Sequence, residues 1–397
     1  MPSVATSEEP SEPPLFTRDF ALILLTQVTF GIAFSSFLLL PKYVVTELHG
    51  SPSQVGYVSA LAVVAAVLSS PLCGKLLDRG GRRPLMLAGC LLSGFSAFAF
   101  LGVTHLGPYL YAVRALQGIS YTLYFVAAGT LVADLAPAAR LGQALGWFGC
   151  AALMMNAVAT LLAEQVARDF GWHAVFAAAA VTGFIGAAVT LFLREPRLEP
   201  KPIQPLEAPR VDGARARVAV LWAAIAGGAA FGAMFTFTQP LALSLGDTNI
   251  SPLFAGYTVM ALAVRLLFGN VADRFGRARV SGAALALYSL VVATTAGLGH
   301  GWLGALGLGF GLAHGMFYPA LNALALEGVP REERGTVGAY FNAAFNGGVF
   351  IVTFCCGQIA QVYGYRVVFL LVACLSVTGS FMLWGQARRK SWLARPS

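Results

Sequence analysis

A few polar side chains interrupt long apolar stretches of this 397-residue chain at helical spacing. Arg114, Gln117 and Tyr121 follow one another at i, i+3 and i+7, which places them on one face of a helix. A second stripe, at i, i+4 and i+8, consists of His314, Tyr318 and Asn322. A guanidinium binds carboxylates and phosphates, and an imidazole can gain or lose a proton near pH 7. The two stripes are therefore candidates for solute binding and proton exchange.

Other polar residues inside apolar stretches could contribute to the same binding site. They are Gln27, Tyr124, Asn156, Gln239, Arg265, Asn342 and Asn346. For each of them, hydrogen bonding or packing between helices is an alternative interpretation. Arg114 could instead be held by carbonyls of the first helix or by Gln27, and His314 could bond to a neighbouring helix. No Asp or Glu lies near the middle of an apolar stretch, so proton exchange would need His314, an end carboxylate such as Glu164 or Glu327, or the solute itself.

The most concentrated charge lies in the stretch GKLLDRGGRRP, and an altered copy, GNVADRFGRAR, occurs in the second half of the chain. The aspartates of the two copies, Asp78 and Asp273, are 195 residues apart. Three further pairs are each 193 residues apart: Asp134 and Glu327, Pro137 and Pro330, and Gly171 and Gly364. The chain therefore consists of two related halves.

Composition places both halves in a membrane. The chain is 57% hydrophobic and 11% charged, whereas a soluble domain has about 25% charged residues. Apolar runs of roughly 20 residues, enough to cross about 30 Å of hydrocarbon, predict twelve helices. Their predicted ranges are 20–45, 54–76, 84–105, 108–133, 142–165, 173–193, 217–244, 253–272, 280–299, 302–326, 335–360 and 365–386.

The distribution of Lys and Arg predicts the orientation of these helices. Of the 26 basic residues, only Lys42, Arg168 and Arg366 lie at the predicted outer face, in loops or at span ends, and Arg114 and Arg265 fall deeper inside spans. We therefore expect a multi-pass protein of the inner (plasma) membrane with both termini in the cytoplasm. The net charge of +8 then reflects topology and contact with anionic lipid, and no nucleic-acid partner is expected.

The expected organisation has five parts. A disordered cytosolic tail covers 1–17, and six-helix bundles cover 18–193 and 217–386. A Pro-rich and charged cytosolic linker at 194–216 joins the bundles, and a cytosolic tail covers 387–397.

The repeated loop resembles the signature loop of the major facilitator superfamily. The matching residues are Gly74-x-x-x-Asp78-Arg79-x-Gly81-Arg82-Arg83 and Gly269-x-x-x-Asp273-Arg274-x-Gly276-Arg277. The stretch RALQG, Arg114 to Gly118, is similar to the fourth-helix motif of that family. The resemblance covers about residues 18–386. It implies an all-α polytopic membrane protein, with twelve transmembrane helices in two pseudo-symmetric six-helix bundles that alternate access to a site between them.

The resemblance further implies that the repeated loops form a gate at the cytoplasmic face. Asp78 would face a helix start near Gly335, and Asp273 would face one near Gly142. The loop arginines would bridge to carboxylates at neighbouring helix ends. The expected gating residues are Gly74, Asp78, Arg79, Arg82, Asp134, Arg140, Gly269, Asp273, Arg274, Arg277, Glu327 and Arg334.

Resemblance to bacterial sugar-efflux and drug-efflux members implies a secondary transporter that exports a small organic solute, driven by the proton gradient. The alternative is a symporter or uniporter that takes up an organic anion through a cavity containing Arg114, Arg265 and His314. One departure argues against antiport: the family's antiporter motif is missing from GQALGWFGCAALMMNAVA in the predicted fifth helix.

Other classes of function lack their sequence signatures. The chain has no evident catalytic cluster or ATP-binding loop, and its six cysteines have no CxxC spacing. We therefore expect neither an enzyme nor a resident cofactor or metal. The expected partners are a small-molecule substrate and membrane lipids, and the protein is expected to be a monomer.

Overall fold

The computed structural model describes residues 15–137, 140–195, 214–267, 271–330 and 333–393. Every regular element in these ranges is a helix. The first half contains α1 (Arg18–Ser35), η1 (Ser36–Leu39), α2 (Leu40–Thr46), α3 (Pro52–Gly80), α4 (Arg82–Ala99), η2 (Phe100–Gly102), α5 (Pro108–Leu135), α6 (Leu141–Phe170) and α7 (Trp172–Thr190). The second half contains α8 (Ala214–Ser244), α9 (Ser251–Leu267), α10 (Val271–Phe275), α11 (Arg277–Thr295), α12 (Leu303–Ala325), α13 (Arg334–Tyr363) and α14 (Tyr365–Leu393).

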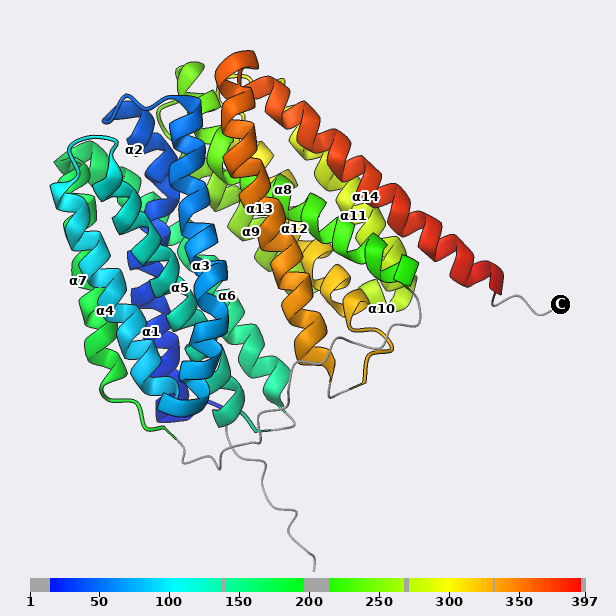
Figure 1. The fold of residues 1–397 in the computed structure, drawn as a ribbon, viewed down its shortest axis with the longest axis horizontal. Coiled ribbons are helices and arrows are strands. Elements are labelled where there is room, and N and C mark those ends of the chain that lie inside the picture. Colours follow the sequence, from blue (N-terminus) through cyan, green and yellow to red (C-terminus); the bar gives the residue numbers. More distant parts are fainter. Residues whose placement is uncertain (1–14, 138–139, 196–213, 268–270, 331–332, 394–397) are drawn as a thin grey trace, which may run out of the picture.

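These helices form two six-helix bundles, as predicted (Figure 1). In each bundle short helices continue a neighbouring long one: η1 and α2 extend α1, and α10 follows α9. Among the described helices, ten are long and apolar enough to cross a membrane, and α9 is a shorter apolar helix. The helix α12 is not among the ten, because glycines and the polar residues of one stripe dilute its apolar content.

The duplication extends to backbone conformation. Gly81 and Gly276 separate equivalent helices with φ of 87° and 90°. Gly171 and Gly364 do the same with φ of 82° and 83°. These left-handed conformations are readily adopted only by glycine. Glycine at these paired positions therefore lets each half make the same sharp turn between helices.

The two bundles touch at one end and diverge at the other. We call the end that carries the repeated Asp-Arg loops the basic end. At the opposite end, α3 and α13 are in contact: Gly56 lies directly against the α13 backbone, and Ser53 Oγ donates a hydrogen bond of 2.9 Å to Gln361 Oε1. Toward the basic end of the same helices, no described atom lies within 4 Å of where a Cβ on Gly74 or Gly338 would stand. The ribbons of the two bundles diverge toward the basic end (Figure 1).

Most predicted helix boundaries lie within five residues of those in the structure, and two spans differ more. The helix α14 continues through Leu393 instead of ending at 386, because the stretch QARRKSWL contains no Gly or Pro to stop it. The predicted span 253–272 is described as α9 and α10, with 268–270 between them outside the described residues. Most of the predicted N-terminal tail and linker, Gly269, and the side chains of Asp78 and Asp273 also lie outside the described residues.

Candidate functional site

A central cavity of about 550 Å³ lies between the two bundles. Its walls come from α1, α3, α5 and α6 of the first bundle and from α8, α9, α12 and α13 of the second. Nine of the predicted binding residues line it: Gln27, Arg114, Tyr121, Asn156, Arg265, His314, Tyr318, Asn342 and Asn346. Residues far apart in sequence thus meet at the interface where the two related halves face each other.

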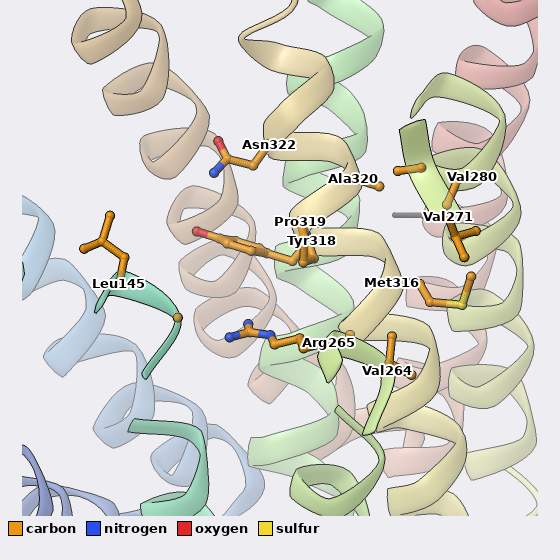
Figure 2. Close-up of a pocket in the computed structure, with 13 residues that line it drawn as sticks. Leu145, Val264, Arg265, Val271, Val280, Met316, Tyr318, Pro319, Ala320 and Asn322 are labelled. Carbon is orange, nitrogen blue, oxygen red and sulfur yellow. The ribbon is translucent and has the colours of Figure 1, made fainter. Parts of the chain in front are cut away.

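A second cavity of about 490 Å³ lies between the central cavity and the basic end. The two cavities share Arg265 and Tyr318, so they adjoin one another. Asn322, the last member of the His314 stripe, lines this second cavity (Figure 2). The described site therefore continues from mid-protein toward the open end.

Three predicted binding residues line neither cavity. Gln117 is buried behind Arg114, and Tyr124 is buried with its ring stacked on Phe30 at a centroid distance of 3.9 Å. Gln239 instead joins the halves near the closed end, where its Nε2 donates to Leu38 O at 2.7 Å. These three residues support the site or the closure without facing the cavity.

Arg114 is held by neutral acceptors in the first bundle. Its Nη1 donates to Gln117 Oε1 at 2.7 Å, and its Nε donates to Val58 O at 3.3 Å. The carbonyl belongs to α3, so the alternative that named helix one or Gln27 as the partner was wrong. Arg114 contacts a carbonyl of α3 because Gly118 brings α5 against the α3 backbone at Ala62.

His314 is positioned by close packing between α12 and α9. Gly307, Gly311 and Gly315 recur every four residues on α12, and a Cβ on any of them would meet the α9 backbone. This small-residue face lets the helices approach closely. His314 Nδ1 consequently lies 2.8 Å from the Tyr257 hydroxyl of α9, and the residue is only 7% exposed. Its Nε2 has no described hydrogen-bond partner.

Arg265 lies on α9 and extends toward α6 of the other bundle. Figure 2 shows the guanidinium directed toward the helix that carries Leu145. Its Nη1 lies 3.5 Å from the position that a Cβ on Gly149 would occupy. The Arg265 Nε is buried, and no described atom accepts a hydrogen bond from it. The residue therefore presents a cation at the bundle interface.

Aromatic rings form most of the apolar cavity wall. In the first bundle the ring of Tyr121 packs against Phe34 at 4.8 Å and against Phe125 at 4.5 Å. In the second bundle Phe231 lies 5.0 Å from the His314 ring. The aromatic residues that line the cavity are Phe30, Phe34, Tyr121, Phe125, Phe231, Phe235, Tyr257, Tyr318 and Phe345. Such a wall suits a flat or bulky apolar body.

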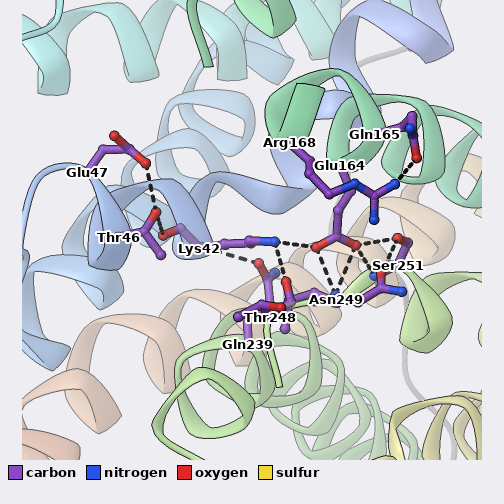
Figure 3. A network of polar contacts seen from close by, with 11 residues as sticks. Lys42, Thr46, Glu47, Glu164, Gln165, Arg168, Gln239, Thr248, Asn249 and Ser251 are labelled. Carbon is purple, nitrogen blue, oxygen red and sulfur yellow. Dashed lines mark hydrogen bonds and ion pairs between the residues drawn. The ribbon is translucent and has the colours of Figure 1, made fainter. Parts of the chain in front are cut away.

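A polar network closes the end opposite the opening (Figure 3). Glu164 of α6 forms an ion pair with Lys42 of α2. The same carboxylate accepts hydrogen bonds from the backbone N–H groups of Ile250 at 2.8 Å and Ser251 at 2.5 Å, and from the Ser251 hydroxyl. Because Ser251 begins α9, the carboxylate lies at the positive end of a helix dipole in the other bundle. We call Lys42, Glu164, Ile250 and Ser251 the closure network.

The sequence did not predict this network. Glu164 and Lys42 were recognised as charges near helix ends, but they are 122 residues apart and belong to different helices. Their opposite charges at one predicted membrane surface were the only available signal. The role of Glu195 was also not predicted. Its carboxylate accepts hydrogen bonds from the backbone N–H groups of Arg82 at 2.5 Å and Arg83 at 3.2 Å, at the start of α4.

At the basic end, Arg82 Nε donates to Asp134 Oδ2 at 2.9 Å. In the second half Arg277 Nη1 donates to Ala323 O at 3.3 Å, near the end of α12 where Glu327 follows. These contacts lie within one half each. No described atom stands within 4 Å of a Cβ on Gly142, the predicted partner site of Asp273. Among the remaining predicted gating residues, Arg79 and Arg274 are exposed, Arg140 precedes α6, and Arg334 donates to Val329 O at 3.2 Å.

Comparison with known proteins agrees with this architecture. The family model described as Major Facilitator Superfamily matches residues 22–247 and 223–396. The chain is similar to multidrug resistance protein MdtG of Dickeya zeae, with 26% identity over 85% of both chains. It is also similar to MdtG of Erwinia billingiae, with 26% identity over 91% of both. Among solved structures, the peptide transporter POT has the same fold, with a TM-score of 0.79, 14% identity and coverage of 93% of this chain and 94% of that one. This chain belongs to the major facilitator superfamily.

Proposed function

We propose that this protein exports small organic compounds from the cytoplasm across the inner membrane by alternating access, with the proton gradient as the driving force. The observation that carries the proposal is a cavity between two bundles that touch at one end and part at the other. The family is one of transporters, and the curated relatives MdtG carry a name that describes multidrug resistance.

In this proposal the basic end faces the cytoplasm, because Lys and Arg are retained on that side of a membrane. The structure then corresponds to an inward-facing state that is ready to load a solute from the cytoplasm. The closure network would have to break for the outward-facing state to form, and the repeated Asp-Arg loops would close the inner face. Uptake of an organic anion is not favoured, since the names of the relatives describe resistance. The proposal involves no chemical conversion of the solute.

The test compares solute accumulation in cells with and without the protein. The panel contains ethidium, 4-phenylbutyrate, a neutral sugar and a dipeptide. Export predicts lower accumulation of at least one compound in expressing cells, and loss of the difference after an ionophore collapses the proton gradient. Arg265→Gln should reduce the difference, whereas Leu266→Ala, which changes a 76% exposed neighbour, should preserve it. Higher accumulation in expressing cells would refute the proposed direction.

A further inference from the structure

The charge of the two adjoining cavities is unbalanced. The described residues that line them include Arg114, Arg265 and His314, and none of the described lining residues is Asp or Glu. A guanidinium remains protonated in proteins. A charge held away from bulk water is unfavourable unless a partner compensates for it. The cavities therefore present positive charge without a described acidic partner.

Arg265 is the stronger anion-binding candidate of the two arginines. Arg114 already donates to Gln117 and to the Val58 carbonyl. Arg265 Nε, in contrast, is buried without a described acceptor, and the side chain reaches across the interface to Gly149. Because Gly149 has no side chain, it leaves room beside the guanidinium. An incoming oxygen acceptor could occupy that room.

Two more residues that line the same cavity carry a buried polar atom without a described partner. His314 Nε2 and Gln27 Oε1 have no described partner, although these residues are 7% and 1% exposed. A buried polar group left without a partner is unfavourable, so a ligand that supplies the partner gains from it. If His314 Nδ1 accepts a hydrogen bond from the Tyr257 hydroxyl, Nε2 carries the hydrogen of the neutral ring and can donate a hydrogen bond. The residues that line the cavity then carry two donors without a described partner, Arg265 Nε and His314 Nε2, and one such acceptor, Gln27 Oε1.

The aromatic wall defines the rest of the ligand. Phe34 and Tyr121 line one side of the cavity, and Phe231 and Phe345 line the other. Rings of this kind bind aromatic or otherwise flat apolar groups. A cationic aromatic compound would gain this packing but would be repelled by Arg265 at the same place. An anionic one gains both interactions.

We propose that the preferred substrates are aromatic organic anions, whose carboxylate or similar oxyanion binds Arg265 while the apolar body lies between the aromatic walls. The inference rests on the proposed function, since it names the substrate class of the same cavity. It does not alter the proposed direction of export.

The test measures equilibrium binding to the purified full-length protein with three radiolabelled compounds of one shape. They are 4-phenylbutyrate, the neutral 4-phenylbutanamide and the cationic 4-phenylbutylamine. The anion should bind about tenfold or more tightly than the amide, because a charge-assisted hydrogen bond replaces a neutral one, and the amine should bind weakest. Arg265→Gln should abolish the preference for the anion over the amide. Arg265→Lys should retain part of it, and Leu266→Ala should retain all of it.

The inference is wrong if the amide binds as tightly as the anion, if the amine binds tightest, or if none of the three binds. Cellular export is scored separately. Export of ethidium together with a preference for the amine would overturn the substrate class and leave the proposed function standing. Specific binding of 4-phenylbutyrate without export of any compound would support the substrate class and refute the proposed function.

Discussion

Arg114 and Arg265 show how one residue type takes two roles in related halves. Both guanidiniums line the central cavity, but Arg114 is held by Gln117 and an α3 carbonyl, whereas Arg265 has a buried donor without a described acceptor. Both residues could be predicted from the sequence, because a charge inside an apolar stretch is rare and faces a cavity or a partner. Their different surroundings could not be predicted, since the partners come from other helices.

Tyr257 and Tyr288 allow a matched test of the His314 site. Tyr257→Phe removes the hydroxyl that lies 2.8 Å from His314 Nδ1, which leaves both ring nitrogens without a described partner. We expect the free energy of unfolding to fall by about 1–3 kcal/mol, seen as a lower melting temperature of the purified protein. Tyr288→Phe removes a buried hydroxyl that has no described partner and should cause little loss. Equal destabilisation by the two substitutions would contradict the role given to this hydrogen bond.

At the scale of helices, glycines at particular positions allow close packing. Gly228 and Gly348 form reciprocal contacts: each lies against a backbone carbonyl of the other helix, α8 against α13. The neighbouring Gly347 has no described atom within 4 Å of its Cβ position. Two adjacent glycines of one helix thus differ completely in what they contact.

This difference predicts a position-specific loss of stability. Gly348→Val should force α8 and α13 apart and lower the free energy of unfolding by about 1–3 kcal/mol, the usual cost of overpacking. Gly347→Val has the same effect on helix propensity but meets open space, so it serves as the control. Thermal unfolding of the two variants in detergent measures the difference. Indistinguishable melting temperatures would mean that α8 and α13 do not pack in this register.

The closure network gives a second prediction for elements. Glu164→Gln removes the ion pair with Lys42 and converts charge-assisted hydrogen bonds at the start of α9 into weaker neutral ones. We expect the closed end to open more often. In a variant whose six cysteines are replaced, a Ser59→Cys reporter in the cavity should react about threefold or more faster with an impermeant thiol reagent added outside.

Glu47→Gln is the control for this experiment, because Glu47 lies near the same end and accepts a hydrogen bond from the Thr46 hydroxyl of its own segment. It should leave the rate of labelling unchanged. The same or a slower rate in Glu164→Gln than in the unchanged background would rule out a role for the network in closing this end.

A feature of the fold could be predicted from the sequence where a short stretch of residues specifies it. Twelve helices, two bundles and the turns at Gly81 and Gly276 depend on apolar runs and on glycines at repeated positions, which a single sequence displays. The end of α14 was misplaced because polar residues can continue a helix beyond the apolar run. The pairing of Lys42 with Glu164 depends on the approach of two bundles, and no local pattern records that approach.

At the scale of the whole molecule, the separation of charges bears on the energy source. Basic residues are concentrated at the end that we propose to be cytoplasmic, and the described cavity lining carries arginines without a carboxylate. A proton exchanger that binds a cation normally needs a group for which proton and substrate compete. An exported anion does not need this competition, because its exit and the entry of a proton are both driven by a membrane potential that is negative inside. The potential is worth about 2.3 kcal/mol per charge per 100 mV, or roughly fiftyfold in concentration.

The whole-molecule prediction is therefore electrogenic export of aromatic anions. In proteoliposomes loaded with 4-phenylbutyrate, a potassium gradient with valinomycin that makes the interior negative should accelerate efflux at equal pH on both sides. A pH gradient that is acidic outside should accelerate efflux further, because proton entry accompanies export in the proposed function. The amide of the same shape provides the control, since it carries no charge and its flux should not respond to the potential. Efflux of the anion that ignores the potential would contradict electrogenic export, and efflux that ignores the pH gradient would contradict coupling to protons.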